Sequence, residues 1–565
     1  MPIYETYTGC HRDDFTSLAD AQKNFKLTWP ENFNFAYDVI DVLAAEKPDK
    51  EALVWVSRDF EEKRFTFRDI SLLSNKAANF FTEVGLRKGD FVLLVMKCSW
   101  LFWPVLMGLH KIGAVAVPAS KMLTRKDYVY RANAGRLRAA IITGDGDCTE
   151  QFDAGTDAYE TMKYKFVIGD KQPVGGGWLN LEAGINAASD VWSRPTGDAA
   201  TCADDIMMMC FSSGTTGYPK MIAHDFTYPL GHIMTGVFWH RVVDGGLHFT
   251  ISDTGWQKAF WGKLYGQWFG ESAIFAYDYD KFDGKDILRL IEKYKITTFC
   301  VPPTMYRMIL QNDVSKYDLS SITHCCTAGE ALNPEIFNQW KEYTGLEIHE
   351  GFGQSETAVM LCTVYPWMKP CPGSMGLPAP GWDAHILDED GNECAPGVTG
   401  EICVRAPSKE ERPRGLLTCY YLNEEATAEA WHDGFYHTGD TAFRDERGLY
   451  HYVGRNDDVI KSSGYRIGPF EVESVLLEHP AVLEVAVTGI PDPVRGFCVK
   501  ATIVLQKGYS PSDELVKELQ NYVKKNTAPY KYPRVVEFWD ELPKTFSGKI
   551  RRTEIRQKDM EKYGK

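Results

Sequence analysis

The sequence predicts an α/β protein in which a large N-terminal body is followed by a smaller α+β unit. Apolar strand-like runs alternate with helix-length segments over most of the chain, which is the rhythm of βαβ units. The texture of the sequence changes after about residue 454. The length of 565 residues also exceeds what one hydrophobic core usually supports, so several structural units are expected.

Strand-like runs define the large body. The run FVLLVM begins at Phe91 and is followed by a helix-like stretch from Trp100 to Lys111 and then by a second strand, AVAVP. Further expected strands lie at 139–144, 206–211, 271–277, 296–303 and 345–353. Several of them end in Gly or Pro, so we expect a mainly parallel sheet whose strand ends carry loops.

The small unit is expected to contain a strand, CVKATIVL, and an amphipathic helix after it. Apolar residues fall on one face of that helix, namely Leu515, Val516, Leu519, Tyr522 and Val523. The stretch 454–468 is polar and marked by glycines, as a linker or hinge is. We therefore divide the chain into residues 1–456 and 457–565.

Composition excludes several functional classes. A net charge of −15 and a pI near 5.4 argue against nonspecific nucleic-acid binding, so small-molecule partners are expected. The longest apolar stretch, 100–119, is interrupted by His110 and Lys111, so no integral membrane association is expected.

The N-terminal residues do not read as a secretory signal or a transit peptide, which makes the cytoplasm the expected location. The fourteen cysteines have no C-x-x-C spacing and are expected to be reduced, and the sequence leaves the oligomeric state open.

One loop has the composition of a phosphate site. Residues 207–224 run from an apolar strand into a segment of small, hydroxylated residues that ends in a lysine. Backbone N–H groups, hydroxyls and an ammonium group are the donors that phosphate needs, and glycines allow the tight turns that aim them. The donors and glycines are Ser212, Ser213, Gly214, Thr215, Thr216, Gly217 and Lys220. The spacing differs from that of the P-loop of nucleotide hydrolases.

Four further stretches accompany this loop: GFGQSET at 351–357, YHTGD at 436–440, GRNDDVIKSSGYRIGPFEVE at 454–473 and PKTFSGKIRR at 543–552. In this order and spacing, the five resemble the motifs of the adenylate-forming superfamily of acyl-CoA synthetases, adenylation domains and luciferases. The chain looks most like the medium-chain acyl-CoA synthetases. The resemblance implies a large body, a small mobile C-terminal domain and an active site at their interface.

The resemblance also implies roles for particular residues. The loop 212–217 and Lys220 would cradle the β- and γ-phosphates of ATP, and Glu356 would contact Mg²⁺. The adenine and α-phosphate would lie against Glu350, Gly351, Phe352 and Ser355, and the ribose and phosphate would contact Asp440, Arg455 and Lys549. Catalytic roles fall to Thr216, Lys220, Glu356 and Lys549.

Coenzyme A and the acyl group would use other positions. Asp457 matches the hinge about which the small domain rotates, and rotation would bring Ser463, Gly464, Tyr465 and Arg466 to the coenzyme. Acetyl-CoA synthetases carry a Trp directly before the Gln of GFGQSET, where this sequence has Gly353. Gly353 and Trp256 are therefore expected to line a deeper acyl pocket.

These features predict an ATP-dependent acyl-CoA synthetase that needs Mg²⁺ and coenzyme A. Its substrate would be a small-to-medium-chain carboxylate, branched chains included, activated through acyl-AMP with release of pyrophosphate and AMP. Two alternatives stay open within the superfamily, an aryl-CoA ligase and an adenylation enzyme that loads a carrier protein. A non-catalytic nucleotide-binding scaffold is the alternative of another class.

Overall fold

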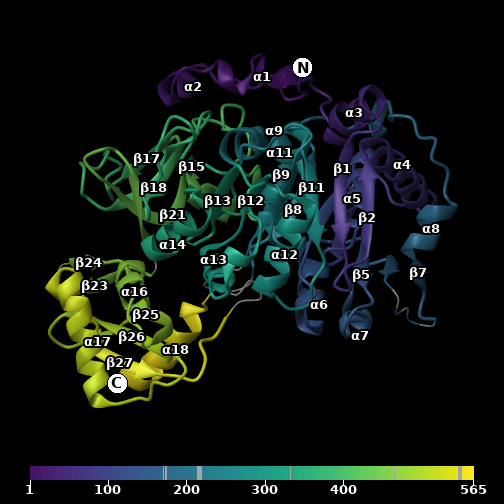
Figure 1. Ribbon diagram of the computed structural model, residues 1–565. Coiled ribbons are helices and arrows are strands. Elements are labelled where there is room, and N and C mark those ends of the chain that lie inside the picture. Colours follow the sequence, from purple (N-terminus) through teal and green to yellow (C-terminus); the bar gives the residue numbers. More distant parts are fainter. Residues whose placement is uncertain are drawn as a thin grey trace.

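The computed structural model contains a large body and a smaller C-terminal unit, which lies at the lower left in Figure 1. It describes residues 1–169, 171, 173, 175–212, 219–330, 332–456, 458–462, 465–544 and 550–564. Two mainly parallel sheets form the large body, so the expected α/β fold is confirmed. Among the described residues, no helix has the length and apolar character needed to cross a membrane.

The first sheet has eight strands in the order β19-β9-β8-β4-β3-β5-β6-β7. Its inner strands are parallel, whereas β9 pairs antiparallel with both β8 and the edge strand β19. The strands are β3 (Phe91–Val95), β4 (Val115–Pro118), β5 (Ala139–Thr143), β6 (Tyr164–Ile168), β7 (Trp178–Asn180), β8 (Ile206–Phe211), β9 (Met221–Asp225) and β19 (Cys419–Tyr420).

The second sheet has nine strands in the order β16-β15-β14-β13-β12-β10-β11-β1-β2. They are β1 (Glu51–Val56), β2 (Glu62–Thr66), β10 (Leu247–Thr250), β11 (Ala273–Tyr277), β12 (Thr298–Cys300), β13 (His324–Ala328), β14 (Ile348–Phe352), β15 (Leu361–Cys362) and β16 (Leu377–Pro378). The strands that the sequence predicts near 91, 139, 206, 271, 296 and 345 all lie in these two sheets.

Helices form three layers around the two sheets. One hydrophobic core joins the facing sides of both sheets to α4 (Phe67–Val84), α5 (Phe102–Ile112), α8 (Leu181–Ala187), α9 (Tyr228–Ile233), α10 (Gln257–Gly262) and α11 (Tyr265–Phe269). The outer face of the nine-stranded sheet is covered by α12 (Gly284–Tyr294), α13 (Pro303–Leu310) and α14 (Pro334–Thr344). The outer face of the eight-stranded sheet is covered by α6 (Arg125–Ala134) and α7 (Cys148–Asp153). The helix expected from Trp100 is α5, and every residue in it is buried.

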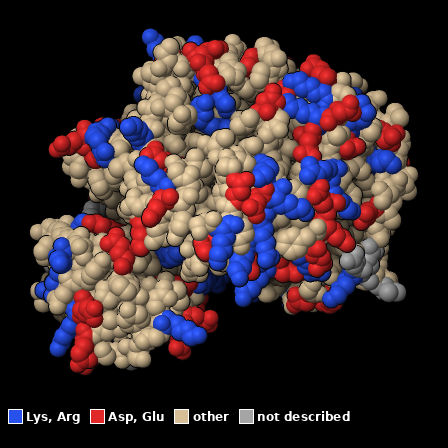
Figure 2. All heavy atoms as spheres, viewed as in Figure 1, with Lys and Arg blue, Asp and Glu red and all other residues tan. Residues whose placement is uncertain are grey.

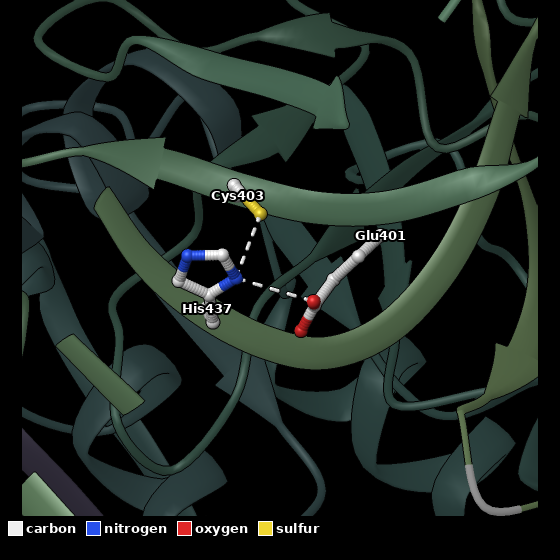
Figure 3. Close-up of side chains that lie close together, drawn as sticks. All are labelled: Glu401, Cys403 and His437. Carbon is white, nitrogen blue, oxygen red and sulfur yellow. Dashed lines mark hydrogen bonds and ion pairs between the residues drawn. The ribbon is translucent and has the colours of Figure 1, made fainter. Parts of the chain in front are cut away.

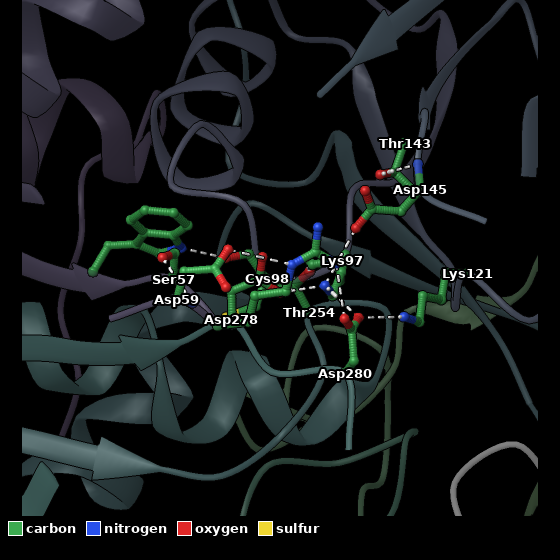
Figure 4. Close-up of polar contacts among 12 residues, drawn as sticks. Ser57, Asp59, Lys97, Cys98, Lys121, Thr143, Asp145, Thr254, Asp278 and Asp280 are labelled. Carbon is green, nitrogen blue, oxygen red and sulfur yellow. Dashed lines mark hydrogen bonds and ion pairs between the residues drawn. The ribbon is translucent and has the colours of Figure 1, made fainter. Parts of the chain in front are cut away.

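An ionic cluster joins the two sheets at their strand ends (Figure 4). The buried ammonium group of Lys97, just beyond β3, lies 3.2 Å from Asp145 beyond β5. It also lies 3.1 Å from Asp278 and 2.9 Å from Asp280, both just beyond β11 of the other sheet. Burial opposes the charge of Lys97, but the three carboxylates outweigh it and raise its pKa.

A third, smaller sheet completes the large body. Its strands are β17 (Ala384–Leu387), β18 (Gly400–Arg405), β20 (Trp431–His432), β21 (Phe435–Arg444) and β22 (Tyr450–Arg455), and α15 (Glu424–Ala430) precedes β20. Three short helices, α1 (Glu5–Thr8), α2 (Leu18–Asn24) and α3 (Val42–Glu46), lie near the N-terminus.

The C-terminal unit has its own sheet and core. Its strands are β23 (Ile460–Ser462), β24 (Tyr465–Ile467), β25 (Val482–Asp492), β26 (Gly496–Leu505) and β27 (Val535–Phe538), with helices α16 (Pro469–Leu477), α17 (Asp513–Asn526) and α18 (Arg552–Tyr563). The predicted amphipathic helix is α17, which buries Leu515, Leu519 and Val523. The boundary expected between 456 and 457 falls at a residue outside the described ones and stays a prediction.

Candidate active site

The predicted phosphate loop joins the antiparallel strands β8 and β9. Its two ends close on each other, since the backbone N–H of Ser212 donates to the carbonyl of Lys220 (2.9 Å) and the N–H of Lys220 donates to Oγ of Ser212 (2.9 Å). Ser213, Gly214, Thr215, Thr216 and Gly217 lie outside the described residues. The hairpin therefore fixes where the loop starts and ends.

Lys220 is linked to Glu356 through an aromatic ring that the sequence did not single out. The ammonium group of Lys220 lies 4.8 Å from the ring centroid of Tyr420. The hydroxyl of Tyr420 donates to Oε1 of Glu356 at 3.0 Å. Tyr420 belongs to β19, which pairs with β9, so the sheet itself brings this ring under the lysine.

The carboxyl group of Glu356 suits the predicted Mg²⁺ contact. Burial raises its pKa, while its own backbone N–H, the Tyr420 hydroxyl and the charge of Arg455 oppose that rise. A divalent cation would favour the ionised form in the same way as these groups do. Magnesium commonly takes one or two protein carboxylates together with phosphate oxygens and water, so this donor set fits the ion.

Asp440 lies at the centre of a second polar group. It is buried on β21, directly opposite Arg455 of β22, and the Arg455 Nε lies 3.9 Å from its Oδ1. The hydroxyl of Tyr452 donates to Oδ1 at 3.1 Å, and the amide of Gln354 donates to Oδ2. The structure thus brings together Asp440 and Arg455, and it connects both with the GFGQSET segment through Gln354.

Three contacts of this group were missed in the sequence analysis. Gln354 stands inside a recognised motif, so its amide could have been named from the sequence. Tyr420 and Tyr452 are 64 and 12 residues from the carboxylates that they contact, and no local pattern marks either one.

The GFG part of the motif packs closely against aromatic rings. A Cβ at Gly351 would lie 2.5 Å from the Trp239 indole, so only glycine fits there. Phe352 is half-buried, with its ring centroid 6.0 Å from that of Tyr452. The carbonyl of Ser355 is bound by His224 at 2.9 Å.

Glu350 is occupied by the protein backbone. Its buried carboxyl oxygens accept from the N–H groups of Leu332 (3.1 Å) and Gly373 (2.8 Å), and burial raises its pKa to about 8. A direct side-chain contact with the nucleotide, as the resemblance implied, would have to compete with these two bonds.

A cluster that the sequence did not predict supports the YHTGD turn (Figure 3). Glu401 Oε1 accepts from the backbone N–H of Gly439 at 2.7 Å, and its Oε2 lies 3.2 Å from Nδ1 of His437. The same Nδ1 lies 3.4 Å from Sγ of Cys403. The three donor types could hold a metal ion, but the contact with Gly439 shows a local structural role, because it fixes the turn that precedes Asp440.

On the acyl side of the site, Gly353 is closely packed. A Cβ there would lie 2.5 Å from the ring of Trp261, at the end of α10, and 2.4 Å from the carbonyl oxygen of Ala358. Trp256 is half-buried immediately before α10. Whether Gly353 and Trp256 line an acyl pocket stays a prediction.

The small unit contributes fewer described residues. Asp457, Ser463, Gly464 and Lys549 lie outside them. Tyr465 is 50% exposed and stacks on Tyr530 with centroids 4.0 Å apart. Arg466 belongs to β24, which pairs with β23.

The start of α18 is joined through α16 to the residues around Asp440. Arg552, three residues after Lys549, donates to Glu473 of α16 (2.6 Å), and Phe470 of the same helix lies with its ring centroid 6.3 Å from that of Tyr452. Since the Tyr452 hydroxyl donates to Asp440, the helix that follows Lys549 begins close to the predicted nucleotide site.

Comparisons with known proteins agree with this geometry. Residues 40–421 match the AMP-binding enzyme family, and residues 471–549 match the AMP-binding enzyme C-terminal domain. The mitochondrial acyl-coenzyme A synthetase ACSM3 of Mus musculus is 41% identical over 570 residues, which cover 99% of this chain and 96% of that protein. The mitochondrial acyl-coenzyme A synthetase ACSM5 of Homo sapiens is 42% identical over 542 residues, covering 94% and 92%.

A solved structure is similar over the same length. The anthranilate CoA ligase AuaEII in complex with anthranoyl-AMP has a TM-score of 0.84 and 29% identity, covering 94% of this chain and 98% of that one. The curated relatives are named as mitochondrial, so the expected cytoplasmic location is not confirmed. The predicted superfamily and the resemblance to medium-chain acyl-CoA synthetases are confirmed. The chain belongs to the AMP-binding enzyme family and, within it, to the acyl-coenzyme A synthetases, which are AMP-forming ligases.

Proposed function

We propose that this synthetase activates small-to-medium-chain carboxylates, straight or branched. The carboxylate oxygen attacks the α-phosphorus of ATP and pyrophosphate leaves; the thiol of coenzyme A then attacks the acyl carbon and AMP leaves. The observation that carries the proposal is a pair of polar groups, Lys220–Tyr420–Glu356 and Gln354–Asp440, which meet in the GFGQSET segment because that segment carries both Gln354 and Glu356. The segment thus links residues suited to phosphate, metal and ribose.

Each of these groups contributes to the first half-reaction. Lys220 and the hydroxyls and N–H groups of 212–217 neutralise the β- and γ-phosphates, and Phe352 offers its ring to adenine, next to Gly351 and Ser355. Buried Asp440 accepts from the ribose hydroxyls, and Arg455 donates to ribose or phosphate. Glu356 would hold Mg²⁺, and the ion would offset the charge that develops on the phosphates. For Glu350 we propose a supporting role, since its carboxyl group is held by backbone N–H groups.

The small domain, residues 457–565, supplies the residues that change between the half-reactions. Lys549 stabilises the charge of adenylation, and the link from Arg552 through Glu473 of α16 to Tyr452, which packs on Phe470 of that helix, supports this placement. Rotation about Asp457 then brings Ser463, Gly464, Tyr465 and Arg466 to coenzyme A. The exposed ring pair of Tyr465 and Tyr530 offers an aromatic surface on which a flat ring can stack.

The surface charge is compatible with anionic substrates. Although the net charge is −15, Lys and Arg side chains gather on the large body in the view of Figure 2, below its centre and on the side toward the small domain. Such a local patch raises the concentration of anions at the surface that carries it.

The test measures pyrophosphate release with ATP and a panel of straight, branched and aromatic carboxylates, with and without coenzyme A. We expect the highest kcat/KM for propionate-sized to medium-chain acids and a thioester only when coenzyme A is present. Preference for aromatic acids would indicate an aryl-CoA ligase, and an acyl-AMP that is not passed to coenzyme A would indicate a carrier-protein partner. Absence of pyrophosphate release with every acid would indicate a scaffold.

The assignment of Lys549 is tested by separating the half-reactions. In Lys549→Ala we expect loss of acyl-AMP formation with thioester formation from supplied acyl-AMP retained, because the charge is needed only in the first conformation. Equal losses in both assays would contradict the role.

A further inference from the structure

A thiol, an imidazole and a carboxyl group meet on the third sheet of the large body, outside the groups assigned to ATP. Cys403 of β18 is paired across the sheet with His437 of β21, and Glu401 comes from the same strand as Cys403. Figure 3 shows the three side chains pointing toward one another. One ligand atom from each of them lies within 4.8 Å of the others. Two strands thus bring three metal-binding groups to one point.

The distances around His437 match those of a tetrahedral zinc site. Its Nδ1 lies 3.2 Å from Oε2 of Glu401 and 3.4 Å from Sγ of Cys403. Zinc binds nitrogen and oxygen at about 2.1 Å and sulfur at about 2.3 Å, so a tetrahedral ion separates N from O by about 3.4 Å and N from S by about 3.6 Å. Two of the three separations are therefore already close to those around a bound zinc ion.

Hydrogen bonds alone do not satisfy both contacts of His437. Its Nδ1 carries either one proton or one lone pair, and one proton cannot point directly at both the oxygen of Glu401 and the sulfur of Cys403. A cation between the three atoms interacts with a lone pair of each. The ring proton then moves to Nε2, which has no hydrogen-bond partner among the described residues, so the change of tautomer breaks no bond there.

Glu401 can bind an ion and keep its structural role at the same time. Its Oε1 accepts from the backbone N–H of Gly439 at 2.7 Å, which leaves Oε2 for the ion. Burial, together with the charges of Glu401 and Glu393, raises the pKa of the Cys403 thiol. The same negative charges attract a cation to the sulfur, and the thiol releases its proton to solvent when the metal binds.

The chemistry and exposure of the cluster favour zinc with an open position. Thiolate and imidazole ligands suit zinc, whereas magnesium prefers oxygen ligands. The side chains of His437 and Glu401 are 19% and 23% exposed, so an ion can reach them from solvent, although Cys403 is fully buried. Water can complete the coordination from that side, as at other zinc sites with three protein ligands.

We propose that Glu401, Cys403 and His437 bind one Zn²⁺ ion through Oε2, Sγ and Nδ1. The ion ties β18 to β21 within the YHTGD segment, three residues before Asp440. Zinc thus stabilises the strand that carries the predicted ribose contact, at a site separate from the predicted Mg²⁺ contact. The inference does not depend on which acid the enzyme activates.

The experiment measures metal binding to the full chain without an affinity tag, after a chelator has removed bound metal. Equilibrium dialysis should give one zinc ion per chain. Cobalt(II) replaces zinc in such sites, and a thiolate ligand gives it a sulfur-to-metal charge-transfer absorption band, which we expect here. Absence of zinc binding, or a cobalt complex without this band, would overturn the proposal.

Two cysteine variants identify the sulfur ligand. Cys403→Ser should abolish the cobalt charge-transfer band, because the hydroxyl group is a poor ligand for a soft site. Cys202→Ser is the matched control, since Cys202 is an exposed cysteine, and it should keep the band. A band that persists in Cys403→Ser would assign the sulfur to another residue and contradict the proposal. If Cys403→Ser does not fold, the histidine variants decide.

Two histidine variants identify the nitrogen ligand. His437→Phe keeps a ring that can stack on His432 but removes Nδ1, so we expect zinc binding to weaken by at least about 10-fold. His385→Phe makes the same change on the neighbouring strand β17, where His385 pairs with Cys403. It should leave the affinity unchanged, because Asp383 and Glu393 already engage both nitrogens of that ring. Equal affinities in the two variants would contradict the proposed ligand set.

Hydrogen exchange tests the effect of the ion on the turn. Zinc should slow the exchange of backbone amides in β18 and β21 of the wild-type protein but not of Cys403→Ser. Strand β26 of the C-terminal unit is the internal control and should exchange at the same rate with and without zinc. Unchanged exchange in β18 and β21 would show that the ion does not tie these strands together.

Discussion

At the scale of single residues, the hydroxyl of Tyr420 is the best defined support of the candidate metal site. It donates to Glu356 at 3.0 Å and is one of the groups that hold the pKa of that carboxyl group down against burial. Tyr420→Phe removes the hydroxyl but keeps the ring beneath Lys220. We expect kcat/KM for pyrophosphate release to fall by about 10- to 100-fold, since one hydrogen bond to a charged acceptor contributes about 1.5–3 kcal/mol.

The pH profile separates this role from a structural one. Without the hydroxyl the pKa of Glu356 rises further, so the acid limb of kcat/KM should move to higher pH. Tyr128→Phe is the matched control, because the buried Tyr128 hydroxyl has no hydrogen-bond partner among the described residues. If the acid limb of Tyr420→Phe stays at the wild-type pH, the Tyr420 hydroxyl does not support the carboxyl group of Glu356.

Residues that touch the site from within a motif could be named from the sequence, and those that reach it from another strand could not. Lys220, Glu356 and Asp440 stand in recognisable segments, and the structure links Lys220 to Glu356 through Tyr420 and Asp440 to Gln354 of the same GFGQSET segment. Tyr420 arrives because β19 pairs with β9, a partnership that no local pattern encodes. Gly353 shows the same limit, since the sequence identifies a missing side chain but not Trp261, whose ring packs against that glycine.

At the scale of strands and helices, we expect the ion pairs of Lys97, which join the ends of β3, β5 and β11, to contribute most to the free energy of unfolding. Lys97→Met would leave Asp145, Asp278 and Asp280 close together with their shared buried cation removed. Breaking such a group costs about 3–5 kcal/mol of unfolding free energy, and we expect the lower end because Asp145 and Asp280 are 35% and 49% exposed.

Urea unfolding of the large body, followed by tryptophan fluorescence, measures this loss. Lys316→Met is the control, since Lys316 is 75% exposed and pairs with the half-exposed Asp313. That change should cost less than about 1 kcal/mol. Replacing Asp278 by Asn in Lys97→Met should recover part of the stability. A loss in Lys97→Met no larger than in the control would contradict the role of the cluster.

The elements themselves were largely predictable, but their order in the sheets was not. Apolar runs bounded by Gly and Pro located β3, β5, β8 and β11, because buried parallel strands have no polar alternation to obscure them. The pairing of β3 with both β4 and β5, and of β10 with both β11 and β12, depends on contacts distant in the sequence.

At the scale of the whole molecule, buried neutral histidines link stability to pH. Burial lowers the pKa of His110, His232 and His248 to about 3 and that of His224 and His349 to about 4, from an ordinary value of 6.5. The unfolded chain therefore binds more protons than the folded one between these values. Their contribution to stability is complete above about pH 6.5 and is lost as the pH falls below it, by up to about 1.4 kcal/mol per pH unit for each ring.

We therefore expect the melting temperature to fall steeply between pH 6.5 and pH 5, as measured by calorimetry in buffers of equal ionic strength. Glu350 acts in the opposite direction. Burial raises its pKa from 4.5 to about 8, so the folded protein binds the extra proton between these values and its stability falls as the pH rises through them. His232→Phe should make the dependence shallower by about one proton, since its ring is fully buried and its Nε2 has no hydrogen-bond partner among the described residues. A melting temperature that is flat from pH 7 to pH 5, or an unchanged slope in His232→Phe, would show that these rings do not govern the acid limit of the fold.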